Sequence, residues 1–160
     1  MPSVLFVCTA NIRRSPMAEI LFVDWLRRSG VSGRWAISSA GTWATEGLPA
    51  APYACEAVKA LGLDLSRHRA RRVDGDLLAA ADLVICMTHS QLEALRAEFP
   101  ACAKRSELFR RLVGQPYDVA DPEEATRQAH FHLLTELEQL IECAGYQIVA
   151  RARNGNGLAP

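Results

Sequence analysis

The sequence predicts a single-domain α/β protein in which a parallel sheet is covered by helices on both faces. Short apolar segments alternate along the chain with segments whose apolar residues recur at helical spacing. The apolar segments are continuous rather than alternating, which is typical of parallel strands buried on both faces. The length of 160 residues corresponds to one domain with one full core.

The elements follow in order along the chain. The first strand is expected at Ser3–Cys8 and the first helix at residues 16–28, with Ser15 as N-cap and Pro16 as first helical residue. The later elements are expected as a strand at 35–39, a helix at 51–61, a strand at 83–87, a helix starting at the capping box of Thr88 and Gln91, a strand at 107–112 and a helix ending at Gly145. We expect residues 1–150 to form the domain and residues 151–160 to form a flexible C-terminal tail.

Composition and charge exclude several classes of protein. The 18 basic and 18 acidic residues give a formal net charge of zero. Binding to nucleic acid or to a membrane surface needs a large basic excess, so neither partner is expected. The five cysteines are an odd number without a C-x-x-C pair, which predicts free thiols in the cytoplasm and no metal site.

The loop after the first strand carries the predicted chemistry. Residues 8–15 read Cys-Thr-Ala-Asn-Ile-Arg-Arg-Ser and join this strand to the following helix. Ligands bind at the carboxyl ends of strands in open α/β sheets, and the N–H groups of such a loop and helix start bind oxyanions. The same field stabilises a thiolate, so Cys8 is predicted to be a nucleophile. Arg14 carries a planar fork that matches two phosphate oxygens.

Ordinary interpretations of the same residues exist. A cysteine at a strand end is usually a small buried apolar residue, and an arginine at a helix start is usually solvated. However, the adjacent cations Arg13 and Arg14 at the positive end of a helix need an anionic partner. The order of strand, Cys8, Arg14, Ser15, Pro16 and helix favours the functional interpretation.

The run from Val4 to Glu19, VLFVCTANIRRSPMAE, resembles the signature of the low-molecular-weight protein tyrosine phosphatases. Further matches follow in order at residues 38–42, 65–71, 81–87 and 118–122, so that the resemblance extends over residues 3–145. It implies a doubly wound α/β fold around a four-stranded parallel sheet with helices on both faces. It also implies that neither a metal nor an organic cofactor is needed.

The resemblance assigns the catalytic roles to three residues. Cys8 would attack phosphorus and form a cysteinyl-phosphate, and Arg14 would hold the equatorial oxygens together with the loop amides. Asp121 would protonate the leaving oxygen and then activate the hydrolytic water. The sequence Asp-Pro-Glu-Glu that begins at Asp121 is also typical of a helix start, in which Asp121 would be a cap, and Asp118 is the alternative acid.

The resemblance also implies a set of residues that bind phosphate and substrate. Ser15 would donate to the thiolate, and Asn11 would hold the loop in shape through Ser39 and His68. Trp43 would lie against the substrate ring. The full set is Thr9, Ala10, Asn11, Ile12, Arg13, Ser15 and Trp43.

Five positions depart from the family pattern or bear on the substrate. Ala10 stands where the family usually has glycine, which costs free energy if the position needs a positive φ. Arg13 stands where the family often has a second cysteine. It would either attract the anionic substrate or face solvent without a role. Residues 123–124 are glutamates where aromatic residues usually wall the pocket. Ile12 accompanies phosphotyrosine specificity, whereas the related arginine phosphatases usually have Thr there.

The function that we expect is hydrolysis of protein phosphotyrosine and other aryl phosphate monoesters, with inorganic phosphate as product. The alternatives are a protein arginine phosphatase, an arsenate reductase on the same scaffold, and a catalytically weak phosphate-binding module. The arsenate reductase needs redox cysteines, for which Cys86 is the only candidate. We expect a cytoplasmic monomer or weak dimer that acts on a phosphorylated protein.

Overall fold

The computed structural model describes residues 1–155 and contains one parallel sheet of four strands. The strands are β1 (Ser3–Cys8), β2 (Ala36–Gly41), β3 (Leu83–Cys86) and β4 (Ser106–Leu108), in the order β2-β1-β3-β4. Because β1 pairs with both β2 and β3, its carboxyl end at Cys8 lies in the middle of the sheet edge. The predicted α/β fold with a four-stranded parallel sheet is confirmed.

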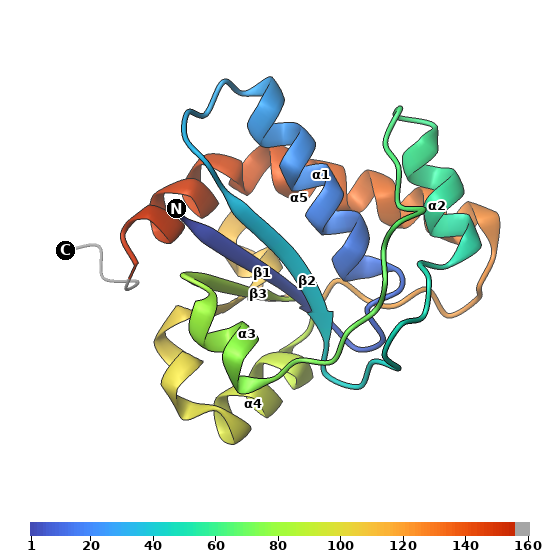
Figure 1. Ribbon diagram of the computed structural model, residues 1–160. Coiled ribbons are helices and arrows are strands. Elements are labelled where there is room, and N and C mark those ends of the chain that lie inside the picture. The colour runs from blue at the N-terminus through green and yellow to red at the C-terminus, as the bar shows by residue number, and fades with distance from the viewer. Residues whose placement is uncertain (156–160) are drawn as a thin grey trace.

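Helices cover both faces of the sheet. The helices are α1 (Arg14–Arg28), α2 (Pro52–Lys59), α3 (Gly75–Ala80), α4 (His89–Glu98) and α5 (Arg127–Arg153), with 3₁₀ segments η1 (Pro100–Arg105) and η2 (Phe109–Val113). Figure 1 shows α1 and α5 on one face and α3 and α4 on the other. Alternate residues of β1 enter the two cores: Phe6 packs with α1 and α5, and Val7 packs with α3 and α4.

The helix starts follow local capping chemistry. The predicted capping box of α4 is present, with Thr88 and Gln91 each bonded to the backbone of the other. Helix α1 begins at Arg14 rather than at Pro16, so Ser15 lies inside the first turn and the prediction that it is the N-cap is wrong. Helix α5 begins after Thr126, whose side chain accepts from the N–H of Ala129.

The last helix extends further than the sequence indicates. Gly145 does not end it, because α5 continues to Arg153, past residue 150 where the domain was expected to end. A Cβ at Gly145 would overlap the ring of Trp25 in α1, so this glycine permits close helix packing instead of terminating a helix. Residues 156–160 of the predicted tail lie outside the described residues.

Candidate active site

The loop between β1 and α1 is held against the end of β2 by main-chain hydrogen bonds. The N–H groups of Thr42 and Trp43 donate to the carbonyls of Cys8 and Thr9, both at 2.9 Å. A Cβ at Gly41 would overlap the Thr9 carbonyl oxygen, so only glycine permits this approach of the two segments. The loop therefore has a fixed position at the centre of the sheet edge. We refer to residues 8–15, which the sequence predicts to bind phosphate, as the phosphate loop.

The sulfur of Cys8 is buried among hydrogen-bonding groups. Cys8 Sγ lies 2.9 Å from the Ser15 hydroxyl, and the backbone N–H of Asn11 donates to it at 3.3 Å. The start of helix α1 adds partial positive charge at the same place. The sulfur therefore faces a hydroxyl and a backbone N–H, both of which can donate a hydrogen bond to an acceptor. The position of Ser15 in the first turn, instead of at the cap, directs its hydroxyl to the sulfur.

Asn11 fixes the curvature of the phosphate loop. It is fully buried and has a φ of 57°, the left-handed conformation that Asn tolerates better than most residues. Its side-chain amide donates to the hydroxyls of Ser15 and Ser39 at 2.8 and 2.9 Å. His68 Nε2 lies 2.7 Å from its carbonyl oxygen, and the N–H of Arg71 donates to its Oδ1 at 3.0 Å. The predicted contacts with Ser39 and His68 are present.

Ala10 occupies its position without a left-handed backbone. Within residues 1–155, Asn11 is the only non-glycine residue with a positive φ. The substitution of the family's usual glycine by Ala10 therefore does not strain the loop in the way that the sequence suggested.

Two further contacts support the loop from outside. Gln91, the capping-box residue of α4, donates from Nε2 to the Thr9 hydroxyl at 3.0 Å. Glu19 accepts from the Ser39 hydroxyl at 2.6 Å, and burial raises the pKa of this carboxyl despite that bond and the nearby cations. The sequence indicated Gln91 only as a cap and gave no signal for Glu19 beyond its place in the motif.

Arg14 and Asp121 meet beside the loop. Arg14 is almost fully buried and donates from Nη1 to the Val119 carbonyl at 2.9 Å. Its Nε lies 3.5 Å from Asp121 Oδ1 and makes no hydrogen bond to the described protein atoms. Asp121 is not a helix cap, because α5 starts after Thr126. A carboxyl group from a distant segment is thus placed next to the loop.

Asp118, the alternative acid, has a different partner. It accepts from both the backbone N–H and the Nδ1 of His89, each at 2.8 Å, at an exposed site on the start of α4. No ion pair joins Asp118 to Arg13 or Arg14 among the described residues. Of the two aspartates, Asp121 is therefore the one that pairs with arginines of the loop.

The remaining predicted residues lie at the rim. Trp43 is 72% exposed, and its ring lies under the Arg72 guanidinium at 4.7 Å. The carbonyl of Ile12 accepts from the N–H of Ala51 at 2.8 Å, which links the loop to the segment before α2. Arg13 is partly exposed and contacts His130 of α5.

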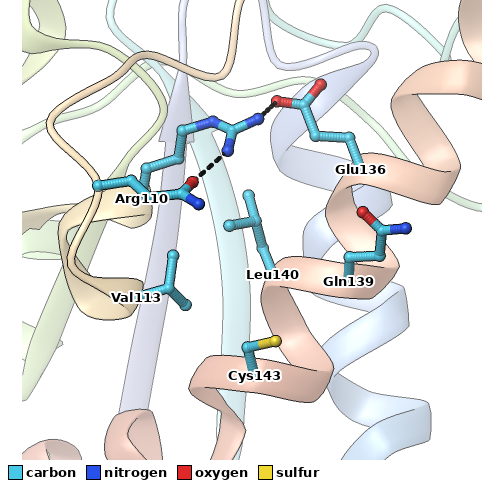
Figure 2. A pocket seen from close by; sticks show the side chains of 7 residues that line it. Arg110, Val113, Glu136, Gln139, Leu140 and Cys143 are labelled. Atoms are coloured by element: carbon cyan, nitrogen blue, oxygen red, sulfur yellow. Dashed lines mark hydrogen bonds and ion pairs between the residues drawn. The ribbon is translucent and has the colours of Figure 1, made fainter.

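One pocket among the described residues is separate from this site. It has a volume of about 460 Å³ and lies between η2 and α5 (Figure 2). Arg110 in its wall is already paired with Glu136 at 2.6 Å, and the exposed Cys143 lies at its other end. None of its lining residues belongs to the phosphate loop. Among residues 1–155, no group of three or more His, Cys, Asp or Glu side chains is arranged to hold a metal ion.

The fold and the loop define a class of protein: an α/β protein with a buried cysteine at the end of an inner strand of its parallel sheet and a buried arginine in the segment that follows. The family model described as "Low molecular weight phosphotyrosine protein phosphatase" matches residues 3–152. The chain belongs to this family.

Phosphatases of this family from several bacteria are similar to this chain in sequence and in structure. The "Probable low molecular weight protein-tyrosine-phosphatase EpsP" of Ralstonia nicotianae is 40% identical over 75% of this chain and 77% of its own. The "Protein-arginine-phosphatase" of Bacillus subtilis is 32% identical over 91% of this chain and 95% of its own. The crystal structure of a low molecular weight protein tyrosine phosphatase from T. tengcongensis superposes with a TM-score of 0.85, at 36% identity over 92% of this chain and 99% of its own.

Proposed function

We propose that the protein hydrolyses protein phosphotyrosine through a cysteinyl-phosphate formed on Cys8. The observation that carries the proposal is the environment of the Cys8 sulfur. It receives the Asn11 N–H and lies 2.9 Å from the Ser15 hydroxyl, in a loop flanked by the buried Arg14. The Arg14 Nε has no hydrogen-bond partner among the described protein atoms, so a donor remains for a bound phosphoryl group. Membership of a phosphatase family agrees with this chemistry.

The first step is transfer of the phosphoryl group to sulfur. The Cys8 thiolate attacks phosphorus, the P–S bond forms and the P–O bond to the tyrosyl oxygen breaks. Arg14 and the loop N–H groups hold the three equatorial oxygens, on which charge develops in the transition state. Asp121, protonated, gives its proton to the leaving phenolate, a contribution of about 10²–10⁴ in rate for such a group.

The second step is hydrolysis of the cysteinyl-phosphate. The Asp121 carboxylate takes a proton from a water molecule that attacks phosphorus, and the P–S bond breaks to return the thiolate and release inorganic phosphate. The Ser15 hydroxyl, 2.9 Å from the sulfur, stabilises the departing thiolate. Asp121 therefore acts first as acid and then as base.

A second candidate substrate is phosphoarginine. A relative named "Protein-arginine-phosphatase" is similar over 91% of this chain, so the scaffold accepts either leaving group. Two features of this chain favour the aryl phosphate: the exposed Trp43 ring beside the loop and Ile12 within it. The arsenate reductase alternative lacks support, because burial raises the pKa of Cys86 to about 12 and holds this thiol protonated.

We further propose that the protein acts in the cytoplasm as a monomer or weak dimer. All five cysteines are free, which suits a reducing compartment. The net charge of zero gives no reason to expect a nucleic-acid partner. No helix within residues 1–155 has the length and apolarity needed to cross a membrane.

The proposal is tested with peptides that carry phosphotyrosine, phosphoarginine or phosphoserine. We expect the wild type to prefer phosphotyrosine, and Cys8→Ser and Arg14→Ala each to lower kcat/KM at least about 10³-fold. Cys143→Ser changes an exposed thiol remote from the loop and is the matched control, expected at wild-type activity. Full activity of Cys8→Ser would defeat the proposal, and a preference for phosphoarginine would replace the substrate. Tight binding of phosphate or vanadate without turnover would indicate a binding module.

A further inference from the structure

A buried histidine of α5 contacts the phosphate loop. His130 is 1% exposed, and its Nε2 accepts from the Nε–H of Arg13 at 3.1 Å. Its other ring nitrogen, Nδ1, lies 2.6 Å from the carbonyl oxygen of Thr126. Its ring packs against that of Tyr53 in α2, with centroids 5.7 Å apart. The side chain is therefore fixed on three sides.

These partners define the protonation of the ring. A guanidinium only donates hydrogen bonds, so Nε2 of His130 must accept, and the carbonyl of Thr126 only accepts, so Nδ1 must carry the proton. The two partners thus select a single tautomer of the ring. As a result His130 presents a fixed acceptor to Arg13 and at the same time holds Thr126, the N-cap of α5.

Arg13 lies between this histidine and the proposed acid. Its Nη1 is 4.0 Å from Asp121 Oδ2, while Arg14 Nε is 3.5 Å from Asp121 Oδ1. When a phosphoryl group occupies the loop, its oxygens engage the Arg14 donors. Arg13 is then the cation that remains beside Asp121. Asp121 is half exposed, so its ion pair with Arg13 contributes little binding energy. We therefore infer that Arg13 acts by positioning the Asp121 carboxyl group.

We propose that His130 is a positioning residue that holds Arg13 beside Asp121, so that the acid stays over the leaving oxygen. The inference rests on the proposed function, since it assigns Asp121 the role of acid. Two structural links carry it. His130 contacts Arg13 in the phosphate loop, and it contacts Thr126 at the end of the segment that contains Asp121. One side chain thereby contacts both the phosphate loop and the N-cap of α5, five residues after Asp121.

The experiment compares His130→Asn with His130→Gln. The shorter Asn reaches the site of Nδ1 but not that of Nε2, whereas Gln places an acceptor oxygen near Nε2 and can still bond Arg13. His132→Asn, at an exposed site two residues further along α5, is the control. Two substrates are compared. Phenyl phosphate releases phenolate, a poor leaving group that needs a proton from the acid, whereas 2,4-dinitrophenyl phosphate releases a good leaving group that does not.

We expect His130→Asn to lower kcat/KM about 10-fold for phenyl phosphate and less than about 2-fold for 2,4-dinitrophenyl phosphate. His130→Gln should recover most of this loss, and His132→Asn should match the wild type. Adding His130→Asn to Asp121→Asn should cause no further loss, because both act through the acid. Arg13→Gln should reproduce the selective loss, and it provides the test if His130→Asn does not fold.

Equal losses on both substrates, or wild-type rates on both in folded His130→Asn and in Arg13→Gln, would overturn the inference. Additive losses in the double variant would do the same. Failure of the proposed function has a different signature: the wild type would hydrolyse neither substrate, or Cys8→Ser would hydrolyse both.

Discussion

Asn11 supplies both a backbone conformation and four of the contacts that shape the phosphate loop. The positive φ turns the chain so that its N–H faces the Cys8 sulfur, and the side chain and carbonyl connect to Ser15, Ser39 and His68. The resemblance of the motif predicted the partners of Asn11. The left-handed conformation of Asn11 was not predicted, because a positive φ leaves no trace in the sequence when the residue is not glycine.

Replacing Asn11 separates these two contributions. Asn11→Ala keeps a Cβ in a left-handed conformation and removes three side-chain hydrogen bonds, so we expect a loss of about 2–4 kcal/mol in the free energy of unfolding. Asn11→Gly relieves the strain but not the lost bonds. Urea denaturation should show Gly more stable than Ala, while kcat/KM falls at least about 10-fold in both. Recovery of activity in Asn11→Gly would show that the hydrogen bonds are dispensable.

The cysteines are expected to differ sharply in reactivity. Cys86 is fully buried, and its pKa of about 12 leaves it protonated at neutral pH. Iodoacetamide should label Cys8 with loss of activity, label the exposed Cys143 without loss, and label Cys86 only after unfolding. Inorganic phosphate should slow labelling of Cys8 alone. Peptide mapping by mass spectrometry measures all three; labelling of Cys8 that phosphate does not affect would contradict an anion site in the loop.

At the scale of elements, the packing of α1 on α5 fixes the geometry behind the site. Trp25 of α1 lies against Gly145 of α5 and is stacked on Phe22. The sequence interpretation of Gly145 as a helix end was wrong, because close packing and termination both select glycine. Helix α3 was not predicted, since six residues are too few to show periodicity, although Asp74 accepts from the N–H of Leu77 as an N-cap.

A methyl group at Gly145 should therefore disturb the helix pair. Gly145→Ala forces a Cβ into the Trp25 ring, and overpacking of this kind costs about 1–3 kcal/mol. Gly75→Ala at the start of α3 is the matched control, because its Cβ would meet only Phe99 at 3.9 Å. We expect the urea midpoint to fall for the first and to stay constant or rise for the second. A midpoint unchanged by Gly145→Ala would refute the tight contact.

At the scale of the whole molecule, folding stability responds to protonation of the network behind the loop. Burial raises the pKa of Glu19 above its usual value of 4.5, so between these two values the native state binds more protons than the unfolded chain. Stability contributed by this group is therefore greatest below pH 4.5 and declines as the pH rises through the native pKa.

Glu19→Gln removes this titration while keeping an acceptor for Ser39. The stability of the variant relative to wild type should rise as the pH increases from below 4.5 toward neutrality. Urea denaturation across this pH range measures the difference in free energy of unfolding between the variant and the wild type. The other titrating groups contribute equally to both proteins and cancel. A difference that is constant, or that falls with increasing pH, would show that the carboxyl is not raised.

The overall architecture follows from the sequence more completely than the site does. Continuous apolar strands and amphipathic helices gave the parallel sheet, since burial on both faces leaves a local pattern. The contacts of Arg14 with Asp121 and of Arg13 with His130 join residues more than 100 positions apart. No periodicity encodes such pairs. The motif resemblance suggested the first, and nothing in the sequence suggested the second.

The most direct test is to locate the phosphate during turnover. A phosphotyrosine peptide is mixed with the wild type and with Asp121→Asn, the reaction is quenched rapidly, and digested peptides are analysed by mass spectrometry. We expect phosphate on the peptide that contains Cys8, bound to sulfur, and no sulfur-bound phosphate in Cys8→Ser, which should not turn over. Phosphate on another residue of the wild type would contradict a cysteinyl-phosphate on Cys8. Turnover at the wild-type rate in Cys8→Ser would contradict it as well.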